Sequence, residues 1–316
     1  MTEDNEAVGG LPDIADLPRA EWLTTVRDLA TSRGDYFELD ADHDVIQVGQ
    51  GDRLIVTFES SHDIRNNQDD GLPVGLKLAQ SMNVAVITIF AKKPTWFRSR
   101  AIYDFFDQLT DEGVFESYEH VAFFGAGMGG YGAAAFSVAA PGSDVVAISP
   151  QATLDARMTE WDPRFVSQRK RSFTDRYGYA PDMVEAARNT LVLYNPEDDV
   201  EAMHATLFAR DGVTRFRCRY VGPDVQATLM EFGIFDAALD LASKGELSLW
   251  KFADLYRARR NSARYLKNLL VECEDQDRPQ RVAWLAGSVL KRKKMPAMRR
   301  ALENVTKRLE TPNAAE

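Results

Sequence analysis

Cysteine is scarce in this sequence: among 316 residues only Cys218 and Cys273 carry thiols. They lie far apart and form no CxxC spacing, which argues against a disulfide framework or a structural zinc site, and we expect two buried thiols. Long apolar runs are also missing, since no stretch approaches the roughly 18 apolar residues of a membrane-spanning helix. We therefore expect a chain without a membrane span.

The N-terminal residues MTEDNEAVGG lack the basic and then apolar character of a signal peptide. This predicts a cytoplasmic protein. The composition, with 45% hydrophobic, 10% aromatic and 27% charged residues, is close to the globular average. It excludes a disordered chain and a fibrous repeat. The length suits one large α/β domain with an appendage.

Charge is distributed unevenly along the chain, whose net charge is −10. Residues 249–316 contain 16 Lys and Arg against 8 Asp and Glu, or +8. Subtraction from the totals of 38 and 48 leaves 22 against 40, or −18, for residues 1–248. An acidic body followed by a basic tail is therefore expected.

Short β-rich runs alternate with helical stretches through the acidic body. This alternation predicts a doubly wound, mostly parallel sheet covered by helices on both faces. The expected strands are residues 44–48, 53–58, 83–90, 120–125, 144–149, 190–194 and 214–221, and the helices between them are residues 74–82, 98–112 and 128–140.

The pattern divides the chain into four segments. Residues 1–40 are expected to be a helical lead-in and residues 41–243 the α/β domain. Within that domain, residues 151–188 are polar and are interpreted as a cap or insertion over the carboxyl edge of the sheet. Residues 244–316 are expected to form a basic helical region, with helices near residues 246–271, 279–294 and 297–310.

A glycine-dense turn between a buried strand and a helix of small residues is the most informative motif. Gly125, Gly127 and Gly129 follow the pattern G-x-nucleophile-x-G, and the turn continues through Met128, Gly130 and Tyr131. This turn resembles the nucleophile elbow of the α/β-hydrolase superfamily. The resemblance covers roughly residues 40–240. It implies a crevice at the elbow, a triad acid at Asp198 or Asp199, and a base in the loop that contains Asp224.

Two of the three triad positions depart from the hydrolase pattern. The nucleophile position holds Gly127, which has no side chain to attack a substrate. The position expected for histidine holds Asp224 or Val225. The favoured interpretation is therefore a catalytically degenerate α/β-hydrolase-like protein, acting as a ligand-binding or scaffold protein. It would hold a small molecule, an acyl group or a carbohydrate in the crevice without a cofactor.

An active enzyme is the first alternative, namely a carboxylic-ester hydrolase, thioesterase or acyltransferase with an unconventional nucleophile. Ser60, Ser61 and His62 follow a strand at the place where hydrolases keep oxyanion-hole donors. On an extended segment Ser60 and His62 face the same way, whereas Ser61 and His62 do not.

A dinucleotide-binding protein is the second alternative. Gly125, Gly127 and Gly130 match G-x-G-x-x-G, whose glycines allow a close approach to a pyrophosphate. That fingerprint normally opens the first βαβ unit, whereas several strands precede it here. The next strand also ends in Ser149, Pro150 and Gln151 without the usual acidic residue.

Several arginine and tryptophan residues are candidates for binding a ligand, because loops at the carboxyl ends of parallel strands converge on one crevice. Packing within the fold is the simpler interpretation of each. The candidates are Arg65, Trp96, Arg98, Trp161 and Arg164, together with Asp224. The histidines His43, His120 and His204 are interpreted as surface or capping residues. No metal site is expected.

The basic tail is interpreted first as a docking element, either on the acidic body of the same chain or on a neighbouring subunit. A protein partner or an anionic surface comes next. Nucleic acid is disfavoured, because basic and aromatic residues are not interleaved as in an RNA-binding motif.

Overall fold

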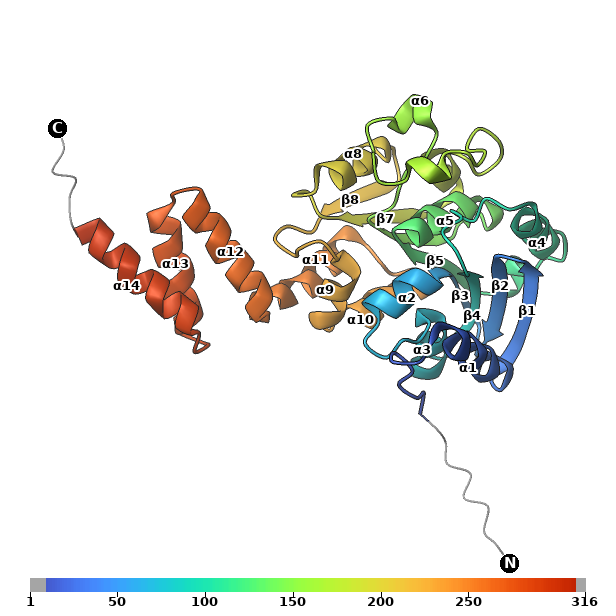
Figure 1. Cartoon of the computed structure of the whole chain (residues 1–316), viewed down its shortest axis with the longest axis horizontal. Helices are drawn as coiled ribbons and strands as arrows, with labels where there is room; N and C mark the ends of the chain where they lie inside the picture. The colour runs from blue at the N-terminus through green and yellow to red at the C-terminus, as the bar shows by residue number, and fades with distance from the viewer. Residues whose placement is uncertain (1–9, 311–316) are drawn as a thin grey trace, which may run out of the picture.

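The computed structural model describes residues 10–310 of the chain (Figure 1). The acidic residues 1–9 and the last residues of the tail, 311–316, lie outside this range. The described part contains an eight-stranded sheet with the strand order β1-β2-β4-β3-β5-β6-β7-β8. The strands are β1 (Gly34–Asp40), β2 (His43–Val48), β3 (Arg53–Ser60), β4 (Ala85–Ala91), β5 (His120–Ala126), β6 (Asp144–Ile148), β7 (Asn189–Tyr194) and β8 (Val213–Arg217).

The sheet is parallel from β4 through β3 to β8, while β2 runs antiparallel to β4 and β1 antiparallel to β2. Together with the helices that connect the parallel strands, this is the α/β-hydrolase fold. The predicted fold class is therefore confirmed. The expected strands all occur, although β8 is shorter than the predicted residues 214–221.

Helices cover both faces of the sheet. Up to residue 243 the helices are α1 (Arg19–Thr31), α2 (Ser61–Asn67), α3 (Val74–Ser81), α4 (Arg100–Asp111), α5 (Met128–Phe136), α6 (Ala156–Thr159), α7 (Ala180–Met183), α8 (Asp199–Leu207), α9 (Val225–Glu231) and α10 (Phe235–Ser243), with single 3-10 turns at Phe115–Ser117, Ser137–Ala139, Val166–Gln168 and Val184–Ala186. One apolar layer includes buried residues of α4, α5, α7 and α8, and the other includes those of α1, α3, α9 and α10. The apolar runs of β3, β4 and β6 are buried between these layers, as expected for strands covered on both faces.

The expectation that residues 1–40 form a helical lead-in is corrected in its second half. Residues 34–40 are the edge strand β1, which pairs with β2 along most of its length. Its sequence GDYFELD is largely exposed, so it lacks the apolar run that marks a buried strand. Only pairing with the following strand makes this segment part of the sheet.

The segment 151–188, expected to be a cap, has two parts. In the second part Phe173, Tyr177 and α7 join the apolar core, and the Tyr177 ring stacks on Phe136 with 4.4 Å between ring centroids. The first part, which includes α6, lies over the carboxyl edge of the sheet (Figure 1). Ala152 and Leu154 of the first part also join the core, so both halves of the segment are anchored to the body.

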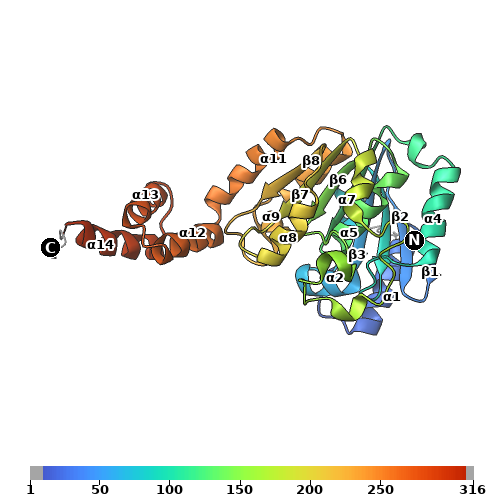
Figure 2. The same ribbon diagram turned by 90° about the horizontal axis from the view of Figure 1, so that it is seen from above.

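After α10 the chain continues with α11 (Leu249–Leu255) and a 3-10 turn (Tyr256–Asn261), whose Phe252 and Tyr256 pack in the core of the body. The helices α12 (Ala263–Asp275), α13 (Pro279–Leu290) and α14 (Pro296–Glu310) then extend away from the body (Figures 1 and 2). We use "the arm" for α12 to α14, which share a separate apolar core. The single helix expected over residues 246–271 is interrupted, because Ser262 caps α12 by accepting a hydrogen bond from the backbone N–H of Tyr265. Cys218 is buried as expected, whereas Cys273 on α12 is only half-buried.

No helix among residues 10–310 is both long and apolar enough to span a membrane.

Candidate ligand site at the strand-helix elbow

The turn between β5 and α5 has the backbone shape of a nucleophile elbow. Gly127 lies at its apex with φ 55° and ψ −118°, a conformation that costs an L-residue on the order of 1–3 kcal/mol. Apart from Gly127 itself and its two chain neighbours, no heavy atom lies within 4 Å of the place where a Cβ on Gly127 would stand. Glycine thus removes the strain of this turn, and the space that a nucleophile would occupy is open.

The neighbouring glycines of the motif allow close packing, because a side chain at each of them would clash with backbone atoms. A Cβ on Gly125 would lie 2.1 Å from the Gly129 carbonyl oxygen, and one on Gly129 would lie 2.1 Å from the Phe58 carbonyl oxygen. A Cβ on Gly130 would lie 2.9 Å from the Ile148 carbonyl oxygen. These residues therefore let α5 approach β3 and β6 closely. The dinucleotide alternative stays a prediction, because of its three glycines Gly127 borders open space whereas Gly125 and Gly130 are packed against backbone.

The two aspartates at the expected acid and base positions cap helices. Asp198 accepts a hydrogen bond from the Glu201 N–H (2.9 Å) at the start of α8. Asp224 accepts one from the Ala227 N–H (2.8 Å) at the start of α9. Asp199 lies in the first turn of α8. Of these three residues, only Asp224 lines a described cavity at the elbow.

The serines considered as unconventional nucleophiles are not paired with a histidine. Ser60 caps α2, and its hydroxyl lies 2.6 Å from Asp63 Oδ2. The Ser61 hydroxyl donates to the Lys92 carbonyl oxygen (2.9 Å). His62 is exposed and lies 3.2 Å from the Asn66 amide nitrogen. The segment is helical from Ser61 onward, so the expectation of an extended loop with alternating side chains is wrong.

Two adjoining cavities lie at the elbow, and together we call them the elbow crevice. Their volumes are about 350 Å³ and about 400 Å³. Asp63, Gly127, Gln151 and Arg164 line both. The first cavity is also lined by Ser149, Glu201 and Asp224, and the second by Ser60, His62, Trp96, Met128 and Phe165.

Three carboxyl groups, those of Asp63, Glu201 and Asp224, line the crevice. Burial raises the pKa of Asp63, against the hydrogen bond from Ser60. Burial also raises the pKa of Glu201, although its Oε2 accepts hydrogen bonds from the Asn195 N–H (3.0 Å) and the Ser149 hydroxyl (2.7 Å). Ser149 has a positive φ of 46°, which is uncommon outside glycine. The carboxyl oxygens and the Ser149 hydroxyl together give the crevice a polar lining.

Arg164 is the cation of the crevice, and its charge is already paired. Its guanidinium makes two hydrogen bonds of 2.9 Å to the carboxylate of Asp162. Burial alone would raise the pKa of Asp162, but the hydrogen bonds from His204 and Arg164 outweigh it and hold that pKa well below its usual range. The Ala152 N–H donates to His204 Nδ1 (3.2 Å), so the proton of neutral His204 lies on Nε2, 3.0 Å from Asp162.

Two of the histidines expected at the surface are buried. His204 is fully buried and packs under Trp161, with 4.7 Å between ring centroids. His43 is 1% exposed and lies between Asp40 and Thr95. In both cases a buried polar partner satisfies the ring, which the sequence alone does not reveal.

Of the predicted ligand-binding residues, the structure places three at the crevice and three elsewhere. Trp96, Arg164 and Asp224 line it, and Trp96 Nε1 donates to the Gln151 side chain (3.0 Å). Arg65 instead donates to the Leu17 carbonyl oxygen (3.1 Å), and Trp161 covers His204. Arg98 holds the segment 151–188 through the Ser172 carbonyl oxygen (2.8 Å) and Asp175.

Within the glycine motif itself, Gly127 and Met128 line the crevice. Tyr131 was expected beside them but is fully buried, and its hydroxyl donates to the Tyr177 carbonyl oxygen (2.5 Å). This tyrosine therefore fastens α5 to the segment 151–188.

The sequence analysis did not predict several polar residues of the crevice lining as site residues. Those that carry the argument here are Asp63, Ser149, Gln151 and Glu201. Each lies shortly after the carboxyl end of a parallel strand, β3, β6 or β7. That position relative to the strands was the available signal, because loops at these ends converge. Among residues 10–310, no group of three or more His, Cys, Asp or Glu is placed to hold a metal ion.

No protein-family model matches the sequence, and no curated protein matches it either. Solved structures do resemble the chain. An esterase from Pyrobaculum calidifontis is 14% identical with a TM-score of 0.44, over 74% of this chain and 95% of that one. Fungal esterases from Rhizomucor miehei are 15% identical with a TM-score of 0.44, over 75% of this chain and 94% of theirs.

A glycosylation-associated protein complex from Streptococcus agalactiae is 13% identical with a TM-score of 0.45, over 66% of this chain and 46% of that one. The activities in these names are those of the similar proteins. The fold of this chain is assigned from its own strand order and connections.

Proposed function

We propose that this protein is a catalytically degenerate α/β-hydrolase-like protein that binds a small ligand in the elbow crevice. The observation that carries the proposal is the elbow itself. Gly127 has the strained backbone of a nucleophile position with an open space beside it and no side chain. Asp224, at the position expected for the base, serves as the cap of α9. A fold without these two groups retains a crevice but loses acyl transfer by the usual route.

The lining of the crevice favours a neutral, hydroxyl-rich ligand such as a carbohydrate. Asp63, Glu201 and Asp224 supply carboxyl groups, while the charge of Arg164 is balanced by Asp162. An anionic ligand would therefore meet uncompensated negative charge. Carboxyl and amide groups beside the Trp96 and Phe165 rings offer hydrogen bonds and an apolar surface together.

Ligand binding is tested by thermal-shift screening against neutral oligosaccharides, acyl-CoA and NAD. A ligand at 100 times its Kd raises the free energy of unfolding by about 2.7 kcal/mol. We expect stabilisation by a neutral sugar that is lost in the Gln151→Ala variant and kept in the exposed-surface control Trp250→Ala. Stabilisation by acyl-CoA or NAD alone contradicts the expected ligand class.

Catalysis is tested separately with a fluorophosphonate probe and short-chain p-nitrophenyl esters. We expect neither labelling nor turnover. Stoichiometric labelling that disappears in Ser60→Ala, Ser61→Ala or Ser149→Ala overturns the proposal. Ser149 is included because its hydroxyl contacts Glu201 inside the crevice. The double variant Gly127→Ser with Asp224→His then asks whether the oxyanion hole persists.

A further inference from the structure

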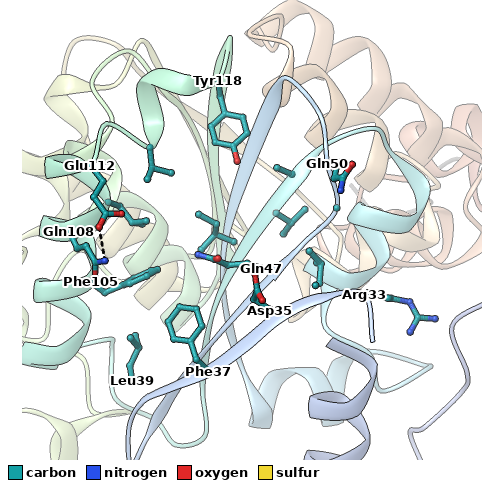
Figure 3. A pocket seen from close by; sticks show the side chains of 18 of the residues that line it. Arg33, Asp35, Phe37, Leu39, Gln47, Gln50, Phe105, Gln108, Glu112 and Tyr118 are labelled. Atoms are coloured by element: carbon teal, nitrogen blue, oxygen red, sulfur yellow. Dashed lines mark hydrogen bonds between the residues drawn. The ribbon is translucent and has the colours of Figure 1, made fainter. Parts of the chain in front are cut away.

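A further cavity lies at the end of the body formed by β1 and α4, away from the elbow. Its volume is about 1010 Å³, the upper end of the range for ligand pockets. We call it the β1-α4 groove (Figure 3). None of the residues that line the elbow crevice lines this groove.

The groove combines an apolar floor with acidic walls. Phe37 of edge strand β1 is 37% exposed, and its ring lies 5.8 Å from that of Phe105 on α4. Leu39, Leu109 and Val114 extend the apolar surface. The charged lining residues are Asp35, Glu38, Asp104 and Glu112 against Arg33. Glu38 is paired with Arg27 and Asp104 with Arg100, so Asp35 and Glu112 supply the acidic character of the walls.

The arm presents the complementary surface. Trp284 on α13 is 67% exposed, although large aromatic side chains are normally buried. Arg281 and Lys291, three residues before it and seven after it, lie on the same face of the helix and are exposed. The exposed residues 291–294 continue the positive charge into the turn before α14.

The groove and the arm lie at opposite ends of the molecule. In both views the arm projects from one end, while β1 and α4 form the other (Figures 1 and 2). The start of the arm is fixed to the body, since Asn268 donates to the Tyr220 carbonyl oxygen (2.9 Å) and Ser262 donates to Glu231 (2.6 Å). The first helix of the arm thus contacts the body of its own chain, whereas α13 and α14 project away from it and do not reach this chain's own groove (Figures 1 and 2).

We propose that the arm of one copy docks in the β1-α4 groove of the next, with Trp284 on the apolar floor and Arg281 and Lys291 facing the acidic walls. The occupant is a second copy of this chain because the two surfaces match in apolar character and in sign of charge. The charges of +8 and −18 on the two parts of the sequence have the same complementarity. Because the two surfaces differ, the contact is heterologous, and it produces a ring or an open chain of copies.

Sedimentation velocity of the full chain across a range of concentrations tests the proposal. We expect species larger than dimers at low salt and their dissociation at 1 M NaCl, where the Debye length falls to about 3 Å. Trp284→Ala is expected to weaken association at least tenfold, since exposed tryptophans often dominate interfaces. Trp250→Ala, which removes another exposed tryptophan outside the arm, is the matched control and is expected to associate like the unmodified chain.

Mixing two variants identifies the groove as the partner of the arm. Trp284→Ala keeps the groove, whereas Asp35→Lys with Glu112→Lys keeps the arm. Each variant alone is expected to be monomeric, and an equimolar mixture is expected to form one-to-one dimers and nothing larger. A monomeric unmodified chain, larger species in either variant alone, or a mixture that stays monomeric overturns the proposal. Circular dichroism of each variant verifies that it has folded.

Discussion

The α/β body and the arm bury their apolar residues in different ways. In the body, helices press so closely on the sheet that backbone atoms fill the space beside Gly125 and Gly129. The ring centroid of Phe58, for example, lies within 6 Å of the ring centroids of Phe97, Phe106 and Phe136. The arm has a small core of ten buried residues and leaves Trp284 outside. Close packing of the helices on the sheet holds the residues of the crevice in place in the body. The small core of the arm leaves most of its residues at the surface.

The largest expected difference in stability is between the substitution of a glycine in the body and the substitution of one in the arm. Gly129→Ala places a Cβ 2.1 Å from the Phe58 carbonyl oxygen, so α5 must move and we expect a loss of more than about 4 kcal/mol or failure to fold. Gly287→Ala, in α13 of the arm with open space around it, is expected to stabilise by about 0.5–1 kcal/mol. Chemical denaturation measures both, and a mild effect of Gly129→Ala contradicts the tight contact.

The next prediction separates the stability of the arm from that of the body. Met298 is fully buried in the arm core, so Met298→Ala is expected to cost about 2–5 kcal/mol locally. Hydrogen exchange measured by mass spectrometry is expected to show lost protection in α13 and α14 and unchanged protection in β3 to β7. The exposed Arg300→Ala is the control. Equal loss of protection in the body would mean that the two regions unfold together.

Acidification is expected to weaken the body and not the arm. Burial lowers the pKa of His43 and of His204, so between the unfolded value near 6.5 and the lower folded values the unfolded chain binds more protons. Their contribution to stability is complete above pH 6.5 and is lost as the pH falls through the folded pKa values. All four histidines precede the arm in sequence. His204→Gln is expected to flatten the decline between pH 7 and 5, whereas exposed His62→Gln does not.

The smallest effect compares one helix cap in each region. Asp224→Ala removes the acceptor for the Ala227 N–H at α9, and Ser262→Ala removes the acceptor for the Tyr265 N–H at α12. Each is expected to cost about 1 kcal/mol, while Asp224→Asn retains most of the stability. Urea denaturation followed by circular dichroism measures these differences. If Asp224→Ala leaves the free energy of unfolding unchanged, Asp224 does not stabilise α9 as its cap.

Most of the fold was predictable from the sequence, because the apolar runs at β3 to β7 can be buried only in a sheet covered on both faces. Strand β1 was not, since its exposed residues are held by pairing with β2. At the site, the elbow and Asp224 were predictable from their positions after strands. Arg65 and Arg98 were not, because a positive charge that fits a ligand equally fits a carbonyl oxygen or carboxylate of the fold.

The sequence by itself determined the alternation of strands and helices, the glycine at the elbow, and the separation of an acidic body from a basic tail. These features follow from local composition and spacing. The tertiary structure decided which carboxyl groups meet at the elbow and which histidines are buried. It also decided that the arm points away from its own body while an acidic groove opens at the other end (Figures 1 and 2). The physical reason is that burial and long-range contact depend on residues far apart in the chain, and no local pattern encodes them.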